Sequence, residues 1–429
     1  MYLRSYFDPS REVYMPLLRR ELRDDENVRR SVKAIIDDVR LRGDEALREY
    51  EERFDSARLD DFYVTQAEFT EAEEAVSDEL KQAVALAYRN IEAFHKAQLP
   101  SGEHVKTMEG VECFRKIVPI DSVGLYIPGG TAPLFSTVLM LAIPAKCAGC
   151  RSVTLATPAR NGRVNPAVLY AASVCGVDRV VKLGGAQAIA ALAYGTQSVR
   201  RVDKIFGPGN RYVSFAKELV SSVCSIDMIA GPSEVMVVAD RTSEPAYIAS
   251  DLLSQAEHGA DSQVILLIRA DSEAEAEDIY LRTEEALARE MSVLGRHEYM
   301  LASLSHSSAL AFYDDSKLIE VINEYAPEHL IISTANADEI LSGVTNAGSV
   351  FLGPYSPESA GDYASGTNHT LPTSGWARSC SGVSVDSFIK KITVQRLSAQ
   401  GLKALGKAVV TMAEAENLMA HAYAVRVRS

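Results

Sequence analysis

Gln255 and His258 lie where an apolar helical run gives way to an apolar strand, in the stretch LLSQAEHGADSQVILLI. On a helix their spacing places them on one face together with Asp251. If Gly259 ends the helix, His258 stands at its C-terminal rim, where open carbonyl oxygens favour positive charge. The pattern is compatible with a bound cation, but for this segment alone a helix-capping histidine beside a solvated glutamine is the simpler interpretation.

Other segments supply nitrogen and carboxylate groups of the kind that Zn²⁺ binds. Asp362 and His369 belong to a long stretch rich in Gly, Ser and Thr (359–382), and His421 belongs to the last helical run. Long loops inside compact enzymes are usually functional. The separations along the chain are large, so spacing suggests a shared metal site without proving it.

A second group of reactive side chains is the pair Glu328 and His329 in YAPEHLIIS. Neighbouring residues of a strand face opposite sides, so both can meet one substrate only if the backbone turns there, which Pro327 favours. Glutamate can activate water, and histidine can move protons near neutral pH. By itself the segment is explained more simply as a solvated turn.

Three glycine-rich segments, GLYIPGGTAP, LGGAQA and FGPGN, are each expected at a turn that flanks a sheet. Backbone amides at such turns can approach a phosphate. None of them matches the dinucleotide pattern G-x-G-x-x-G. They support a nucleotide site only weakly, and ordinary tight turns are the simpler interpretation.

The elements that must position these residues alternate along the chain. SVTLATP precedes the helical NPAVLYAASVCG, RVVKLG precedes GAQAIAALAYG, and KIFGPG precedes NRYVSFAKELVSSV. The apolar runs EVMVVAD, SQVILLI and HLIIST lead into helical runs in the same way. This alternation predicts an α/β protein with parallel sheets covered by helices. The first hundred residues are expected to be helical, and so is the end of the chain.

Composition excludes several classes of protein. The 429 residues carry a formal net charge of −14 with scattered basic residues, so no nucleic-acid partner is expected. The longest apolar run is interrupted by Pro144 and Lys146 and predicts buried core, with no membrane span. The N-terminus lacks an export signal, and the six cysteines are too few for a disulfide framework, which together predict a cytoplasmic protein with free thiols.

In this order the segments closely resemble the histidinol dehydrogenases. The resemblance spans nearly the whole chain and includes DVRLRGDEALREYEERFD, VGLYIPGGTAPLFSTVLMLAIPA, GGAQAIAALAYGT, VDKIFGPGN, AGPSEV, SQAEHGADSQ, YAPEHL, NAGSVFLGPYSPESAGDYASGTNHTLPT and AEAENLMAH. Motifs of this length in this order are highly specific.

The resemblance implies an NAD-dependent, Zn²⁺-containing homodimer that oxidises L-histidinol through L-histidinal to L-histidine, the last step of histidine biosynthesis. It implies that His329 takes the alcohol proton as hydride leaves, and that Glu328 activates the water that adds to the aldehyde. It implies metal ligands from one subunit at Gln255, His258 and Asp362, with His421 supplied by the other. These six residues are also expected to contact substrate, together with Ser233, His369 and Glu416. The positions implied for NAD are Tyr126, Gln187 and Asn210.

The resemblance also implies two doubly wound, Rossmann-like domains of the kind found in aldehyde dehydrogenases. We expect a helical N-terminal arm (1–25), a discontinuous domain carrying the metal and catalytic residues (26–125 with 235–375), an NAD-side domain (126–234) and a C-terminal dimerisation arm (376–429).

Three other functions remain open on the sequence. One is a zinc-dependent dehydrogenase for a different polar diol or amino alcohol, which the presence of His369 and Glu416 makes less favourable. The second is a zinc hydrolase that uses Glu328 as its general base. The third is a metal-binding scaffold without catalytic activity. Reduction of NAD by histidinol would distinguish a histidinol dehydrogenase from the hydrolase and the scaffold.

Overall fold

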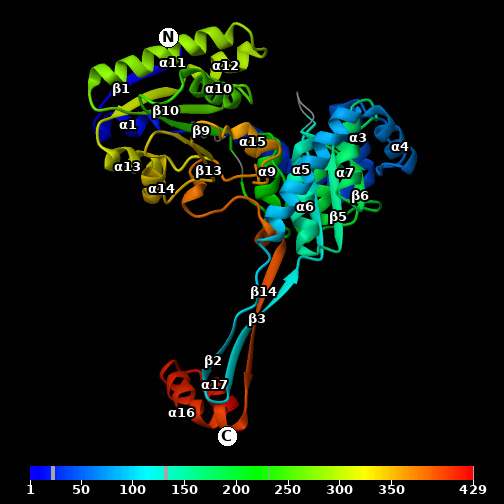
Figure 1. Ribbon diagram of the computed structural model, residues 1–429. Helices are drawn as coiled ribbons and strands as arrows, with labels where there is room; N and C mark the ends of the chain where they lie inside the picture. Colours follow the sequence, from blue (N-terminus) through cyan, green and yellow to red (C-terminus); the bar gives the residue numbers. More distant parts are fainter. Residues whose placement is uncertain (21–24, 130–133, 230, 429) are drawn as a thin grey trace.

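The strands form three sheets in the computed structural model, which describes residues 1–20, 25–129, 134–229 and 231–428. Two of the sheets are parallel and covered by helices. The third is a long antiparallel ribbon that projects from the rest of the molecule (Figure 1). The expected α/β architecture with two parallel sheets is confirmed.

The larger parallel sheet has six strands in the order β1-β11-β10-β9-β12-β13. Their bounds are β1 (Arg4–Phe7), β9 (Glu234–Ala239), β10 (Gln263–Arg269), β11 (Ser308–Phe312), β12 (His329–Ser333) and β13 (Ser349–Leu352). One face packs on α10 (Pro245–Ala256), α11 (Glu273–Met291) and α12 (His297–Leu304), and the other on α1 (Arg11–Leu17), α13 (Asp315–Tyr325) and α14 (Ala337–Gly343). Because both faces are covered, the strands are continuous apolar runs rather than alternating ones.

The smaller parallel sheet has the order β6-β5-β4-β7-β8. Its strands are β4 (Ser122–Tyr126), β5 (Ser152–Thr157), β6 (Arg179–Lys182), β7 (Lys204–Phe206) and β8 (Ser225–Ile226). The chain enters at the central strand, winds to one edge, and then returns to build the other half. This is the doubly wound order of Rossmann-like sheets, which places a topological switch between β4 and β7.

Two layers of helices cover this smaller sheet. The first contains α4 (Gln66–Ala75), α5 (Asp78–Lys96), α6 (Phe135–Ala148) and α7 (Pro166–Val174), and the second contains α2 (Glu26–Arg42), α3 (Asp44–Asp55), α8 (Gly185–Tyr194) and α9 (Arg211–Val220). The apolar run predicted as core is α6, which is buried from Ser136 through Ala145. Within the described residues we find no helix with the length and apolar character of a membrane span.

The ribbon joins two distant parts of the chain. It consists of β2 (His104–Met108), β3 (Val111–Pro119) and β14 (Ile389–Leu397), with β14 antiparallel to β3 along its full length. Helices α16 (Ala399–Ala415) and α17 (Met419–Arg426) lie at its far end, and we call the ribbon and these helices the arm (Figure 1).

Two segments pack differently from the expected division of the chain. The segment expected as a helical arm (1–25) contains, within its described residues 1–20, a strand as well as α1: Arg4–Phe7 pairs in parallel with β11 and satisfies the outer backbone groups of that strand. The helices between residues 26 and 96 cover the smaller sheet instead of joining residues 235–375. In α2, for example, Val28, Val32, Ile36 and Val39 form one buried stripe in the same core as α8 and α9. The remaining domain boundaries stay a prediction.

Candidate active site

The amino-terminal edge of the six-stranded sheet gathers most of the expected reactive residues. His329 begins β12 and pairs with Val235 of β9, so the residues just before these parallel strands lie side by side. Helix α10 runs back between β9 and β10, which brings its C-terminal end to the same edge. Residues from three separate segments therefore meet there.

Glu328 and His329 are buried next to one another, with His329 Nδ1 and Glu328 Oε2 3.7 Å apart. The expected turn is present, because Ala326 has a positive φ of 51° and the strand starts only at His329. Glu328 Oε2 accepts a hydrogen bond from the backbone N–H of Glu234 at 2.9 Å, and the carbonyl of Glu234 lies 3.1 Å from His329 Nδ1. The backbone of one residue thus holds both side chains.

That carbonyl, at 3.1 Å, can only accept a hydrogen bond, and it lies closer to Nδ1 than the Gln255 Nε2 donor at 3.3 Å, which favours the neutral His329 tautomer with its proton on Nδ1. Its Nε2 then has a lone pair, and this atom lies 3.6 Å from Asp362 Oδ1. Burial lowers the pKa of His329, but the carboxylates of Glu358, Glu328 and Asp362 outweigh burial and raise the pKa above its ordinary value. The ring is therefore a strong proton acceptor as long as no cation neutralises the three carboxylates.

At His329 the neighbouring charges outweigh burial, whereas at Glu328 burial dominates and disfavours the charged form. Desolvation raises the pKa of this carboxyl to about 8, although the neighbouring His329 and the Glu234 N–H act against the shift. A carboxylate with a pKa near neutrality is a stronger base than an ordinary glutamate. The pair therefore provides two proton acceptors of different strength at one place.

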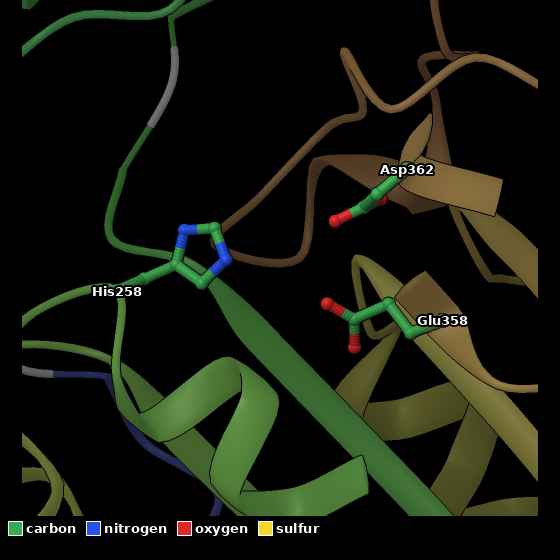
Figure 2. Close-up of side chains that lie close together, drawn as sticks. All are labelled: His258, Glu358 and Asp362. Carbon is green, nitrogen blue, oxygen red and sulfur yellow. The ribbon is translucent and has the colours of Figure 1, made fainter. Parts of the chain in front are cut away.

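His258, Glu358 and Asp362 form a cluster whose potential ligand atoms all lie within 4.8 Å of one another (Figure 2). Glu358 and Asp362 occupy the first and second turns of α15 (Glu358–Tyr363), one helical turn apart, so both carboxyls point to the same side. Helix α10 ends at Ala256, earlier than expected, and His258 lies just beyond it. A tight turn from His258 N–H to the Gln255 carbonyl, 3.2 Å long, aims the imidazole at the two carboxyls.

Several buried atoms of this centre have no hydrogen-bond partner among the described residues. They are Gln255 Oε1, His329 Nε2, Glu358 Oε2 and Asp362 Oδ1. A buried polar atom left unsatisfied costs about 1–3 kcal/mol, so four at one place need an explanation. Oxygen and imidazole nitrogen are the donors that a divalent cation such as Zn²⁺ accepts, and the excess of carboxylates supplies the compensating charge. The residues present fit a metal ion.

Two further expected residues lie beside this centre. His369 Nδ1 is 3.0 Å from the backbone carbonyl of Asp362, and its Nε2 is 3.1 Å from the hydroxyl of Thr137 on α6. His369 therefore connects the centre to the helices of the smaller sheet. Ser233 directly precedes β9, one residue before Glu234.

Glu416 and His421 are not brought to the centre within this chain. Glu416 caps the end of α16, His421 is in α17, and both side chains are exposed. Figure 1 places these helices at the far end of the arm, away from α15. A single chain therefore holds only part of the set that the sequence predicted.

The three positions expected for NAD lie at the carboxyl-terminal edge of the smaller sheet. Tyr126 ends β4, and its hydroxyl accepts a hydrogen bond from Gly185 N–H at 3.0 Å. Gln187 is in the first turn of α8, and Asn210 caps α9 by accepting from the N–H groups of Tyr212 and Val213. Tyr126 and Asn210 flank the switch between β4 and β7, where doubly wound sheets bind ligands.

In FGPGN, position 207 can be occupied only by glycine. Its φ is 124°, and a Cβ built on it would lie 2.1 Å from the carbonyl oxygen of Tyr126. No side chain fits that space. The close approach of the two backbones brings the ends of β4 and β7 together at the switch.

Glu358 is the member of the centre that was not predicted from the sequence. A signal for it existed, since Glu358 and Asp362 are spaced one helical turn apart in PESAGDY and the helix starts directly after Pro357. No pattern in the sequence could predict that Glu234 holds Glu328 and His329, because its contacts with them are made by its backbone N–H and carbonyl.

These features define an α/β enzyme with a buried acid–base pair beside a metal-binding centre. The profile of the histidinol dehydrogenase family matches residues 18–429. Histidinol dehydrogenase of Bacteroides thetaiotaomicron is 53% identical over 422 residues, covering 98% of this chain and 97% of its own length. That of Escherichia coli is 51% identical over 415 residues, covering 96% and 94%.

A solved structure points to the same family. Histidinol dehydrogenase from Elizabethkingia anophelis is 47% identical, with a TM-score of 0.96 over 100% of this chain and 98% of that one. The chain belongs to the histidinol dehydrogenase family, and it is an oxidoreductase.

Proposed function

We propose that this chain oxidises L-histidinol through L-histidinal to L-histidine, with two NAD⁺ as acceptors, and completes histidine biosynthesis. Membership of the family supports the substrate. The observation that carries the chemistry is the burial of Glu328 and His329 side by side, 3.7 Å apart, against a centre with unsatisfied metal-binding atoms. Each of the two oxidations needs its own base, and the chain offers two.

In the first oxidation His329 removes the proton of the alcohol as hydride leaves the adjacent carbon. Its Nδ1–H is held by the carbonyl of Glu234, so Nε2 is the atom that takes the proton. Asp362, 3.6 Å from Nε2, stabilises the imidazolium that results. The burial of the pair excludes bulk water from the transfer.

In the second oxidation Glu328 activates the water that adds to the aldehyde, which converts the carbonyl into a hydrate that can lose a second hydride. The backbone N–H of Glu234 fixes the carboxylate during this step. With its pKa raised to about 8 by burial, Glu328 takes a proton from water more readily than an ordinary glutamate does.

The metal ligands of the proposal are Gln255, His258 and Asp362 of one chain, with His421 of the partner subunit. Zn²⁺ at this place would orient the imidazole and amine of histidinol and compensate the surrounding carboxylates. The unsatisfied Oε1 of Gln255 and Oδ1 of Asp362 support this set. Ser233, His369 and Glu416 of the partner subunit complete the substrate contacts.

NAD is assigned to the edge formed by Tyr126, Gln187 and Asn210. The support is their position at the carboxyl-terminal edge of a doubly wound sheet, where the N-terminal ends of α8 and α9 lie and where Tyr126 and Asn210 flank the topological switch. The hydrogen bond between His369 and Thr137 links this half of the molecule to the metal centre. The substrate, which donates hydride, is thereby assigned to the six-stranded sheet, and NAD, which accepts it, is assigned to the smaller sheet.

The proposed enzyme is a homodimer with shared active sites. Its support is the position of Glu416 and His421 on the arm, together with exposed apolar side chains on the same helices, such as Met412 at 66% and Tyr423 at 65%. Such apolar surface is typical of an interface. The cytoplasmic location stays a prediction from the sequence.

The decisive assay mixes the purified protein with L-histidinol, NAD⁺ and Zn²⁺ and measures NADH and histidine. We expect two NADH for each histidine formed. A zinc hydrolase or a metal-binding scaffold would form no NADH. A dehydrogenase for another amino alcohol would leave histidinol unoxidised and reduce NAD with its own substrate.

A further inference from the structure

Glu51 is a fully buried acid that the proposed reaction does not use. It lies in α3, and its Oε1 accepts two hydrogen bonds, from Gly184 N–H at 3.0 Å and from Gln187 Nε2 at 2.9 Å. Both donors belong to the start of α8, more than a hundred residues further along the chain. One carboxyl oxygen thus holds both the backbone entering α8 and the side chain of Gln187.

The second oxygen of Glu51 receives no hydrogen bond from a described residue. Its neighbour is Asp55, one helical turn further along α3, whose Oδ2 lies 2.7 Å from the place of a Cβ on Gly184. A buried carboxylate next to a half-buried one repels it, which favours a proton on one of the two. An Oε2–H on Glu51 that donates to Asp55 satisfies the orphan oxygen and removes the repulsion.

The surrounding charges favour the proton on Glu51. Burial and the neighbouring Asp55 raise the pKa of Glu51 to about 8. Burial also raises the pKa of Asp55, but the hydrogen bond from Glu51 and the charge of Arg160 lower it. Tyr126 also faces the pair, and its pKa is raised by burial and by both carboxyls. Burial is complete at Glu51 and only partial at Asp55, so of the two carboxyls Glu51 is the one that keeps a proton more readily.

We propose that Glu51 is a positioning residue of the dinucleotide site, which fixes the orientation of the Gln187 amide and of the backbone at Gly184. The inference rests on the proposed function, because Gln187 is there assigned to NAD. With its Nε2 bound to Glu51, Gln187 presents its carbonyl oxygen toward Gly185, 2.8 Å from the place of a Cβ on that residue. An oxygen in this position recognises a donor group, such as a carboxamide N–H or a ribose hydroxyl of the cofactor.

Without Glu51 the amide of Gln187 can rotate and turn its N–H₂ toward the cofactor, which weakens binding. Glu51→Met keeps the volume of the side chain but cannot accept either hydrogen bond. Glu51→Gln keeps a neutral group whose oxygen accepts both donors and whose N–H₂ donates to Asp55. Glu52→Gln, on the exposed side of the same helix, is the matched control.

The experiment measures kcat, the KM for NAD, the KM for histidinol and the zinc content of the full-length enzyme. For Glu51→Met we expect the KM for NAD to rise about tenfold, while the KM for histidinol and the zinc content stay within about twofold of the parent. Glu51→Gln and Glu52→Gln should both resemble the parent. A merely structural role would lower the active fraction and leave the KM for NAD unchanged, and this result would overturn the inference.

A pH series provides a second measurement that does not depend on Glu51→Met folding. Between about pH 7 and about pH 9.5 the KM for NAD should rise in the parent, because repulsion between ionised Glu51 and Asp55 displaces the carboxyl that holds Gln187, and it should rise less in Glu51→Gln. Identical profiles in the two proteins would overturn the inference while leaving the proposed function intact. A parent enzyme that does not reduce NAD with histidinol would overturn both.

Discussion

The two sheet edges that carry the expected functional residues differ in how their polar groups are satisfied. At the amino edge of the six-stranded sheet, buried atoms of Gln255, His329, Glu358 and Asp362 lack partners among the described residues. At the carboxyl edge of the smaller sheet, Tyr126 and Oε1 of Glu51 are hydrogen-bonded within the chain, and Oε2 of Glu51 lacks a partner among the described residues. The first edge therefore fits a bound ion, whereas most polar groups of the second are held by contacts within the chain.

The difference also concerns where the missing groups come from. The residues of the smaller sheet are contributed by one chain, and α3, α8 and β4 hold them together. Of the residues proposed for the metal centre and its substrate, Glu416 and His421 lie exposed on the arm. Changes at the metal centre should therefore affect metal content and assembly-dependent activity. Changes at the carboxyl edge of the smaller sheet should affect NAD affinity and intrinsic stability.

The largest effect is expected from Glu328→Gln at the amino edge of the six-stranded sheet. The first oxidation should continue, because His329 is retained, but loss of the base for water should slow the second by about 10²–10⁴-fold. Rapid-quench analysis should then find accumulated histidinal and one NADH for each turnover. Histidine formed at the parental rate would show that Glu328 does not activate water.

His421→Ala tests whether the arm completes the centre of another chain. We expect it to lower zinc content and to reduce kcat about 100-fold, because the metal loses one ligand. Mixed dimers of His421→Ala and His329→Ala subunits should recover part of the activity, since one of their two sites contains only intact residues. Verified heterodimers without recovery would exclude sharing of sites between chains.

Glu358→Gln tests whether the unpredicted carboxyl belongs to the metal centre. It removes one negative charge from the cluster with His258 and Asp362, so zinc affinity should fall about tenfold. Competition with a chelator of known affinity measures the change. Glu339→Gln, exposed on α14, is the control and should bind zinc like the parent. Equal affinities in both variants would remove Glu358 from the centre.

The smallest effect concerns the stability of the carboxyl edge of the smaller sheet. Burial raises the pKa of Glu51 to about 8 in the folded chain, whereas an unfolded glutamate keeps its ordinary value of 4.5. Between these values the folded chain holds a proton that the unfolded chain has lost, so the free energy of unfolding falls as pH rises, by at most about 1.4 kcal/mol per pH unit.

Glu51→Gln has no ionisable group at that position, so its free energy of unfolding should depend less steeply on pH across this window. Urea denaturation of the parent and the variant at a series of pH values gives both slopes. Glu52→Gln serves as the exposed control. Parallel slopes in the parent and in Glu51→Gln would show that the carboxyl is not perturbed by burial.

Local patterns in the sequence determined much of the architecture and part of the site. Alternating apolar runs predicted parallel sheets covered by helices, since each pattern depends only on neighbouring residues. Pro327 predicted the turn that brings Glu328 and His329 together. The spacing of Gln255 and His258 predicted that their side chains point to the same side, although His258 lies beyond the end of α10.

Only the tertiary structure decided which distant segments meet. Arg4–Phe7 could pair with any exposed strand edge, and the apolar stripe of α2 could cover either sheet, because a pattern shows that a face is buried without showing against what. The contacts of Glu51 with α8 and of Glu234 with Glu328 and His329 join segments far apart in the chain. Such meetings depend on complementary shape and charge across the whole fold, and no local spacing records them.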